Sequence, residues 1–486
     1  MIKLIKNEFV KLFHKKAIYI LIFLTILLIG FETFITKINE NFIYSDEEYY
    51  SKIVEPLLNG EVTDYSEIQV LLDDKYYYDL SQLAKEFKKG QNSWEYVYLV
   101  DKVGSYITCM NENKYLYKND KKYNECQKSY DEELKYVKNN SWQDVLKSEK
   151  NEYEKSKQEL ESTFKSLANG EEKDEVTKEI KILEYRIAGI NYSLNDNIEP
   201  NTSKKAQLVS TYVNQAIVYL DYNEDESTYK NRALLEEKRN VEKEYKEAKY
   251  KLDNKMYGND KDISLIEMLN SSVTTPIFLV IIAVIMIAGS IMADEYSKGT
   301  IKQLLLRPYT RSQILFSKFI TALLVSIMFL LFYILSEVII YGFITGYKEL
   351  SLPIVMYDYN LSKVVLISAW KYIGLYILAL LPFYVILLSV AFLIGSTIGS
   401  SVVAFIVAFV TYFFGNIVSG FASVTNVVAL KFLPMMNWDL SAYLFGGLPT
   451  FKYCNFKLAL IVDIVTIVIL FVLALVLFKR KNITNQ

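Results

Sequence analysis

The charged residues with the clearest potential for chemistry lie in one segment, Asp294 to Lys318, between two apolar runs. The run before it, Met268 to Ala293, has 26 residues without a charge, and the run after it extends from Phe319 to Ser336. Loops rich in Lys and Arg beside membrane helices stay on the cytoplasmic side. The segment is therefore expected to face the cytoplasm, where a partner protein could bind it.

Within this segment, residues of distinctive type follow a fixed order: Glu295, Gly299, Thr300, Leu304, Leu305, Pro308, Arg311 and Lys318. The order resembles the E-x(3)-G-T-x(3)-L-L-x(2)-P-x(2)-R-x(6)-K pattern that follows the second membrane helix in ABC-2 type transporter permeases. An ordinary basic loop that only orients the helices would explain the lysines and arginines by charge alone. It would not explain a glycine and a proline at these positions.

The resemblance implies how such a loop would work. In that family, two membrane subunits pair as a homo- or heterodimer, and the loop docks a separate ATP-binding subunit through a short coupling helix, here expected within Thr300 to Ser312. The resemblance implies that Glu295 and Arg311 hold the loop in place through polar contacts, and that Gly299 and Pro308 form its turns. Leu304, Leu305 and Leu306 would insert into an apolar groove of the ATPase.

A second candidate site consists of charged residues within or beside expected membrane helices: Glu32, Glu337, Lys371 and Asp463. Ionisable residues inside membrane helices are costly and commonly functional. By helical rise, each acidic residue falls toward the outer end of its helix. Two interpretations stay open: a polar cluster that lines an outward cavity, or separate side chains that reach interfacial water.

Other kinds of chemistry lack the residues they need. The chain has one histidine, His14, which excludes His-based triads and most zinc sites. No G-x(4)-G-K-[ST] loop is present to hold nucleotide phosphates. We therefore expect no enzymatic activity, no metal and no cofactor on this chain, and we expect ATP and Mg on a partner subunit. Its paired lysines lie among acidic residues, which argues against nucleic-acid binding.

Six apolar runs are long enough to cross a bacterial plasma membrane: Ala17 to Thr36, Val273 to Ala293, Phe319 to Ile344, Trp370 to Ser396, Val402 to Gly420 and Leu458 to Phe478. Gly395, Ser396, Gly399, Ser400 and Ser401 are expected to form the turn between the fourth and fifth, although the Gly395-x(3)-Gly399 spacing could also bring two helices close together. Lys479, Arg480 and Lys481 follow the sixth, which places both termini in the cytoplasm. No small-residue cleavage site follows the first run, so a retained anchor is favoured over a signal peptide.

The division of the chain follows from these runs. Residues 1–16 are expected to form a cytoplasmic amphipathic interface helix, although a simple positive flank fits equally well. Residues 17–37 form the first membrane helix, 38–267 an extracellular domain, and 268–486 a five-helix membrane region with the coupling loop at 294–318. Residues 37–267 have a charge balance of −12 and the rest of the chain one of +10.

The expected extracellular domain has helical periodicity. Leu146, Tyr153, Leu160 and Leu167 repeat every seven residues, and narrow apolar seams recur near Val176 to Ile190 and Leu234 to Leu252. Such seams indicate coiled-coil packing, with the first two helices as an antiparallel hairpin. The segment from Glu48 to Lys122 is rich in tyrosine, which fits either a recognition surface or overall composition. Cys109 and Cys126 could form a disulfide outside the cell, or remain buried thiols.

Together these features predict an all-α membrane protein with six transmembrane helices and a mostly helical extracellular insertion between the first two. The resemblance implies the permease subunit of an ATP-driven exporter. Its partners would be an ABC ATP-binding subunit, a second permease copy or paralogue, and membrane lipid. The cargo implied is an antimicrobial peptide or another amphipathic or lipid-like substrate. The alternative is a membrane-anchored stalk, scaffold or receptor of a secretion or phage-receptor system without an ATPase.

Overall fold

A computed structural model gives the fold of the chain. It describes residues 2–38, 54–55, 65–87, 93–167, 170–201, 203–223, 225–229, 232–257, 265–274, 277–423, 425 and 427–481. The described chain is mostly helical and divides into two compact units. We call Met1–Ile35 with Ile263–Gln486 the membrane unit and Thr36–Asp262 the inserted unit.

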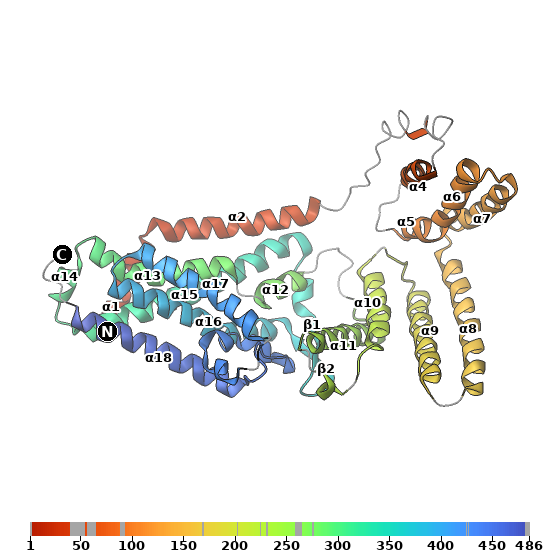
Figure 1. Cartoon of the computed structure of the whole chain (residues 1–486). Coiled ribbons are helices and arrows are strands. Elements are labelled where there is room, and N and C mark those ends of the chain that lie inside the picture. The colour runs from red at the N-terminus through yellow and green to blue at the C-terminus, as the bar shows by residue number, and fades with distance from the viewer. Residues whose placement is uncertain are drawn as a thin grey trace. The chain divides into compact units, whose positions relative to one another are not determined.

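The membrane unit begins with two helices, α1 (Ile2–Phe13) and α2 (Lys16–Ile38), which meet at an angle of 62°. The helices that follow are α12 (Leu265–Thr274), α13 (Phe278–Ser297), α14 (Ile301–Leu305), α15 (Arg311–Thr345), α16 (Ala369–Thr397), α17 (Ser401–Ser423) and α18 (Phe456–Arg480). The unit also has short 3-10 segments: η6 (Lys348–Ser351), η7 (Val428–Phe432), η8 (Pro434–Met436) and η9 (Leu440–Gly446). Figure 1 places α14 and both chain ends at one end of the bundle.

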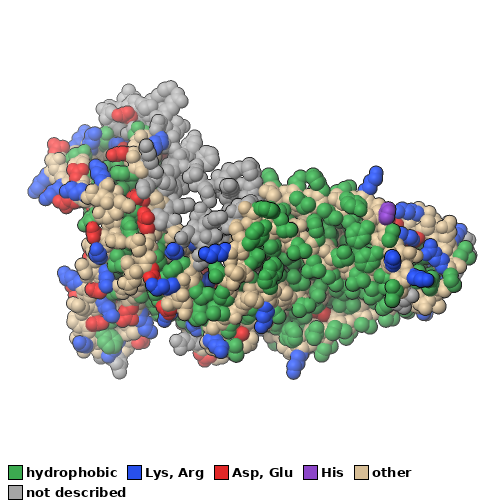
Figure 2. Space-filling model, turned by 180° about the vertical axis from the view of Figure 1, so that it is seen from behind, with side chains coloured by type: hydrophobic (Ala, Val, Ile, Leu, Met, Phe, Trp, Pro, Cys, Tyr) green, Lys and Arg blue, Asp and Glu red, His purple; other side chains and the backbone are tan. Residues whose placement is uncertain are grey.

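Five described helices are long and apolar enough to cross a membrane, or six if α1 and α2 count together as one bent span. The five are α13, α15, α16, α17 and α18. Figure 2 shows hydrophobic side chains over most of the visible face of the membrane unit, with Lys and Arg gathered at one end. Long apolar helices whose apolar side chains face outward are typical of a multi-pass membrane protein.

Helix α13 lies at the centre of this unit and packs against α15, α16 and α17. Its contact with α16 is close, because a Cβ atom added at Gly395 would lie 2.4 Å from the backbone oxygen of Gly289. Gly395 therefore lies within α16, where it lets α16 pack closely against α13. The expectation that Gly395 forms the following turn is wrong. That turn contains Gly399 instead, whose φ of +82° suits glycine.

The membrane unit also contains a β-hairpin, which corrects the expectation of an all-α chain. Strands β1 (Pro353–Asp358) and β2 (Lys363–Ser368) pair antiparallel, with Pro353 opposite Ser368 and Asp358 opposite Lys363. β-branched residues are frequent in both strands, as in V-V-L-I of β2. Asp358 accepts a hydrogen bond from the backbone N–H of Asn360 and so closes the turn.

The described residues of the inserted unit form helices joined by turns and loops. Its helices are α4 (Tyr65–Phe87), α5 (Trp94–Tyr98), η3 (Leu99–Val103), α6 (Gly104–Asn111), η4 (Glu112–Leu116), α7 (Asp120–Lys138), α8 (Trp142–Ser166), α9 (Glu171–Asn195), α10 (Lys204–Tyr219), η5 (Glu226–Thr228) and α11 (Arg232–Asp253). One apolar cluster joins α4, α6 and α7, and another joins α9, α10 and α11. A disulfide between Cys109 and Cys126 links α6 to α7, with the Cα atoms 6.2 Å apart.

Helices α8 and α9 form a hairpin (Figure 1). Tyr153 and Leu160, from the seven-residue repeat, are half-buried along α8, and Leu167 lies just beyond its end. Lys157 of α8 forms an ion pair with Glu184 of α9, at 2.8 Å. A thin apolar seam with charged side chains beside it thus holds the two helices together.

Candidate functional site

A lysine without solvent exposure marks the candidate site in the membrane unit. Lys318, in the second turn of α15, has a side chain with 0% exposure. Its ammonium group lies 2.6 Å from Glu8 Oε2, 3.0 Å from Glu295 Oε1 and 3.2 Å from the carbonyl oxygen of Ile291. An ammonium group has three N–H donors, so each one has an acceptor. A fully buried cation of this kind is tolerated because all its hydrogen bonds are made.

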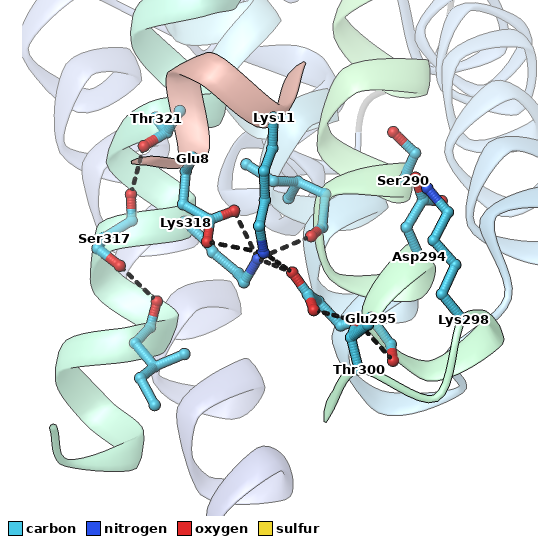
Figure 3. A network of polar contacts seen from close by, with 12 residues as sticks. Glu8, Lys11, Ser290, Asp294, Glu295, Lys298, Thr300, Ser317, Lys318 and Thr321 are labelled. Atoms are coloured by element: carbon cyan, nitrogen blue, oxygen red, sulfur yellow. Dashed lines mark hydrogen bonds and ion pairs between the residues drawn. The ribbon is translucent and has the colours of Figure 1, made fainter. Parts of the chain in front are cut away.

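Glu295 is the acceptor at the centre of the cluster (Figure 3). Its Oε1 accepts from Lys318 and from Lys11, whose ammonium group lies at 2.7 Å, and its Oε2 accepts from the hydroxyl of Thr300. Gly299, at the end of α13, has φ +68° and redirects the chain, so that Thr300 faces back toward Glu295. The E-x(3)-G-T spacing therefore has a physical basis in this turn.

Helix α1 contributes the remaining charges from the other end of the sequence. Its buried side chains are Leu4, Glu8 and Leu12, spaced four residues apart on the face that contacts α15. Lys11, on the next face, is half-exposed and reaches both Glu295 and Glu8, the latter at 3.8 Å. We call Glu8, Lys11, Glu295, Thr300 and Lys318 the charge cluster. It contains two carboxylates and two ammonium groups, so its formal charges balance.

The energetics of the charge cluster favour a role in positioning over one in stability. Buried ion pairs recover their desolvation cost only with good geometry, and apolar replacements of similar volume are often equally stable. Removing one partner is different, because it leaves a buried charge unbalanced, at a cost of about 3–5 kcal/mol. The cluster therefore fixes how α1, α13 and α15 lie relative to one another more than it adds to the free energy of folding.

The loop beyond Thr300 contains the short helix α14, followed by a turn through Pro308. Leu304 is buried at 3% exposure and Leu305 is half-buried against the same core, whereas Leu306 is 86% exposed. The expectation that all three leucines contact a partner is therefore wrong for Leu304, which packs inside the membrane unit because α14 lies on its core. Leu306 is the leucine that a partner could contact directly.

Arg311 makes polar contacts at the end of the loop, with helix α18 as its partner. Its guanidinium donates to the carbonyl oxygens of Lys479 at 2.8 Å and Lys481 at 3.1 Å, at the C-terminal end of α18. A cation there satisfies carbonyl groups that the helix leaves without a partner and complements the negative end of the helix dipole. Arg311 therefore anchors the start of α15 to the end of α18, while Glu295 holds the start of the loop through Lys11, Lys318 and Thr300.

The structure does not assemble the second candidate site around Asp463. Both carboxylate oxygens of Asp463 are buried in α18 and accept no hydrogen bond within the described part of the chain, so Lys371 does not pair with it. Glu337 is buried in α15, while Lys371 is exposed at the start of α16. Glu32 lies in α2, and its side chain falls outside the described residues. In the same described part, no three His, Cys, Asp or Glu side chains form a group suited to a metal ion.

Comparison with known proteins identifies the family. The model of the DUF2705 family, described as a protein of unknown function, matches residues 238–484. This chain belongs to the DUF2705 family. The DUF2705 match contains all five long apolar helices, the loop with α14, and the cluster residues Glu295, Thr300 and Lys318. Glu8 and Lys11 lie outside the matched range.

A curated relative shares part of this region. The uncharacterized protein YhcI of Bacillus subtilis (strain 168) is 25% identical over 222 residues, which are 44% of this chain and 67% of YhcI. No solved structure matches the chain. The DUF2705 description and the printed name of YhcI assign no activity, so the site geometry has to support the functional proposal.

Sequence reasoning missed Glu8 and Lys11, although one signal for Glu8 was present. Leu4, Glu8 and Leu12 occur at intervals of four, which places a carboxylate in the middle of an apolar stripe of α1. A charge in such a stripe needs a buried partner. Lys318, the basic residue directly before the apolar run of α15, is the partner that the structure supplies.

Proposed function

We propose that this chain is the membrane subunit of an ATP-driven exporter of ABC-2 type, and that a separate ATP-binding subunit docks on α14 and the turn after it. The observation that carries the proposal is the convergence of Glu295, Thr300 and Lys318, three residues of the resembling pattern, on one buried charge cluster beneath α14. A loop that served only to orient the helices would need its positive charges but no buried carboxylate.

The proposed membrane topology has six crossings, with both termini and α14 in the cytoplasm of a bacterium and the inserted unit outside the cell. Support comes from the basic residues at one end of the membrane unit, where Figure 1 shows α14 and both chain ends. Arg311 and Lys481 lie at this end, and the Lys481 ammonium group donates to the carbonyl oxygen of Thr397 at 2.6 Å. The disulfide between Cys109 and Cys126 also suits an oxidising exterior.

The proposed mechanism transmits motion from the ATPase to the helices. Binding of ATP and Mg to the partner subunits brings them together and pushes on α14. Ile301 and Leu304 pack α14 on the core, and Glu295 and Thr300 tie its start to Lys318. A push on α14 therefore moves α13, α15 and α1 as a group, and opens the membrane unit of a pair of such chains toward the outside.

The proposed cargo is an antimicrobial peptide or another amphipathic, lipid-like molecule. The inserted unit would meet it first, and the acidic balance of residues 37–267 suits a cationic cargo. The coiled-coil character of α8 and α9 gives this unit a rigid extension, with the Lys157–Glu184 pair across the seam.

The test is copurification of the full chain from its own membranes, followed by identification of bound proteins. The proposal expects a subunit with a phosphate-binding loop in a fixed ratio to this chain. Leu306→Asp should weaken that association by about thirtyfold, as expected for loss of an interface hot spot. Leu361→Asp is the matched control. It makes the same change at another exposed leucine, in the β1–β2 turn, where 57% of the residue is exposed.

Two outcomes would contradict the proposal. A stable chain that purifies without an ATP-binding subunit would favour the stalk or scaffold function. An association that Leu306→Asp and Leu361→Asp weaken equally would place the docking surface elsewhere.

A further inference from the structure

A cavity of about 470 Å³ opens between α2, α13 and α17, separate from the charge cluster. Its walls are apolar and include Ile18, Leu21, Met286, Val402 and Phe405. Its volume lies within the range of about 300–1,000 Å³ that is usual for small-molecule sites. Val402 is 65% exposed on the outer surface of α17, so the cavity adjoins the surface that faces lipid.

One end of the cavity is polar and positively charged. Ser290 and Asp294 line it from α13, and Lys298 continues the same face one turn later (Figure 3). The ammonium group of Lys15 lies 2.8 Å from Asp294 Oδ2 and 2.9 Å from the hydroxyl of Ser290. Lys298 reaches the same Oδ2 atom at 3.7 Å.

The charges at this end do not balance. Lys15 and Lys298 each contribute an ammonium group. Among the residues that the structure describes, both form their ion pair with one carboxylate, that of Asp294. One positive charge therefore remains next to an apolar cavity at the end of a membrane helix. A phosphate group complements it, because lysine binds phosphate as a point charge and the hydroxyl of Ser290 can also contact it.

We propose that this cavity binds one anionic phospholipid, with its phosphate between Lys15 and Lys298 and an acyl chain against Ile18, Met286 and Phe405. An acyl chain in the bilayer already has apolar surroundings, so transfer into the cavity gains little free energy from the hydrophobic effect. The charge at the mouth provides the affinity, and the walls select a chain that fits. Lipid binding in this cavity does not depend on whether an ATPase docks on α14.

The experiment is native mass spectrometry of the full chain in detergent, titrated with phosphatidylglycerol, phosphatidylcholine or glycerol 3-phosphate. Phosphatidylglycerol should bind with one molecule per chain and in preference to phosphatidylcholine. Lys298→Gln should weaken phosphatidylglycerol binding by about fivefold, the effect of one lysine near a lipid headgroup. Lys302→Gln, an exposed lysine of the same loop outside the cavity, should leave binding unchanged.

A second pair of variants tests the walls. Val402→Trp fills the cavity and should abolish the bound lipid, whereas Val410→Trp, two turns along the same exposed face of α17, should not. Equal effects of Lys298→Gln and Lys302→Gln, or lipid retained by Val402→Trp, would overturn the proposal. So would full competition by glycerol 3-phosphate, which would mean a phosphate site without a lipid. A change of oligomeric state in Val402→Trp without loss of lipid would assign the cavity to a second copy of the chain.

Discussion

Two lysine–glutamate pairs of nearly equal length lie in the two units of the molecule. Lys318 and Glu295 are 3.0 Å apart in the membrane unit, and Lys157 and Glu184 are 2.8 Å apart in the inserted unit. The first pair is buried, with side-chain exposures of 0% and 7%. The second is open to solvent, with exposures of 27% and 51%.

Burial, and not distance, decides what each pair can do. Water screens the exposed pair and can replace either partner, so the α8–α9 hairpin can lose it at little cost. The buried pair has no water to replace a partner, and its remaining hydrogen bonds come from Glu8, Lys11, Thr300 and the carbonyl of Ile291. Movement of one helix away from the others would leave a buried charge, so the charge cluster makes α1, α13 and α15 move together.

Removal of the buried cation should have the largest effect. Lys318→Met leaves Glu8 and Glu295 buried with only half-exposed Lys11 to balance them, and should lower the free energy of unfolding by about 3–5 kcal/mol. The measurement is thermal unfolding of the purified full chain in detergent, monitored by tryptophan fluorescence.

The double variant Lys318→Met/Glu295→Met is the control for this prediction. It leaves Glu8 opposite Lys11, so the formal charges balance again, and it should be more stable than Lys318→Met alone. Additive losses in the double variant would show that side-chain packing, and not charge balance, explains the effect.

The hydroxyl of Thr300 should have the next largest effect. Thr300→Val keeps the shape of the side chain but removes the donor to Glu295 Oε2, at an expected cost of about 1–2 kcal/mol. Thr321→Val is the matched control, because the buried hydroxyl of Thr321 donates only to the carbonyl of Ser317 in its own helix (Figure 3). Equal losses in the two variants would contradict a specific role for Thr300.

A half-buried pair in the inserted unit should show an intermediate effect that depends on pH. Arg239 donates two hydrogen bonds to Glu226, at 3.0 and 2.6 Å, and so lowers the pKa of that carboxyl. The pair stabilises the fold above the pKa of an unfolded glutamate, about 4.3, and loses its effect as the pH falls through the lower folded-state pKa.

The free energies of unfolding of Glu226→Gln and the parent chain should therefore differ by about 1 kcal/mol at pH 6, and the difference should shrink as the pH falls below the pKa of an unfolded glutamate. Glu152→Gln, on the exposed face of α8, should match the parent at both values. A difference for Glu226→Gln that stays constant with pH would mean that the ion pair is not its cause.

The exposed pair should have the smallest effect. Lys157→Ala removes the contact with Glu184 and should change the free energy of unfolding by less than about 0.5 kcal/mol, and by still less in 0.5 M salt. If Lys157→Ala lowered the free energy of unfolding as much as Lys318→Met does, the proposed difference between the exposed and the buried pair would be contradicted. Parallel measurement of both variants in the same detergent provides the comparison.

The sequence predicts the long helices and the local turn at the site, because both depend on neighbouring residues. Uninterrupted apolar runs predict α16, α17 and α18 to within three residues, since a span has to satisfy its own backbone hydrogen bonds. They also predict α13 and α15, but α13 begins five residues later than its run and α15 eight residues earlier, because polar residues extend α15 before the apolar run. The spacing of Glu295, Gly299 and Thr300 marks a turn that the structure shows as a contact between Thr300 and Glu295. These are contacts within six residues of one another.

The missed features depend on contacts between distant residues. Glu8 lies 310 residues from Lys318, so only the packing of α1 on α15 brings them together. The burial of Leu304 likewise depends on the core below α14, which an L-L-L sequence cannot reveal. The β1–β2 hairpin lies between two long helices, where short strands with half-buried faces give a weak periodic signal.

The most direct test of the account asks whether ATP moves α15 through the charge cluster. A cysteine at Phe343, 80% exposed at the far end of α15, can be labelled with a membrane-impermeant thiol reagent in proteoliposomes that contain the chain, with Cys454→Ser, and its copurified ATPase. The account predicts that ATP with vanadate changes the labelling rate in this parent protein but not in Lys318→Met/Glu295→Met, although the proposed partner subunit hydrolyses ATP in both preparations. The same ATP-dependent change in both proteins, or in neither, would contradict it.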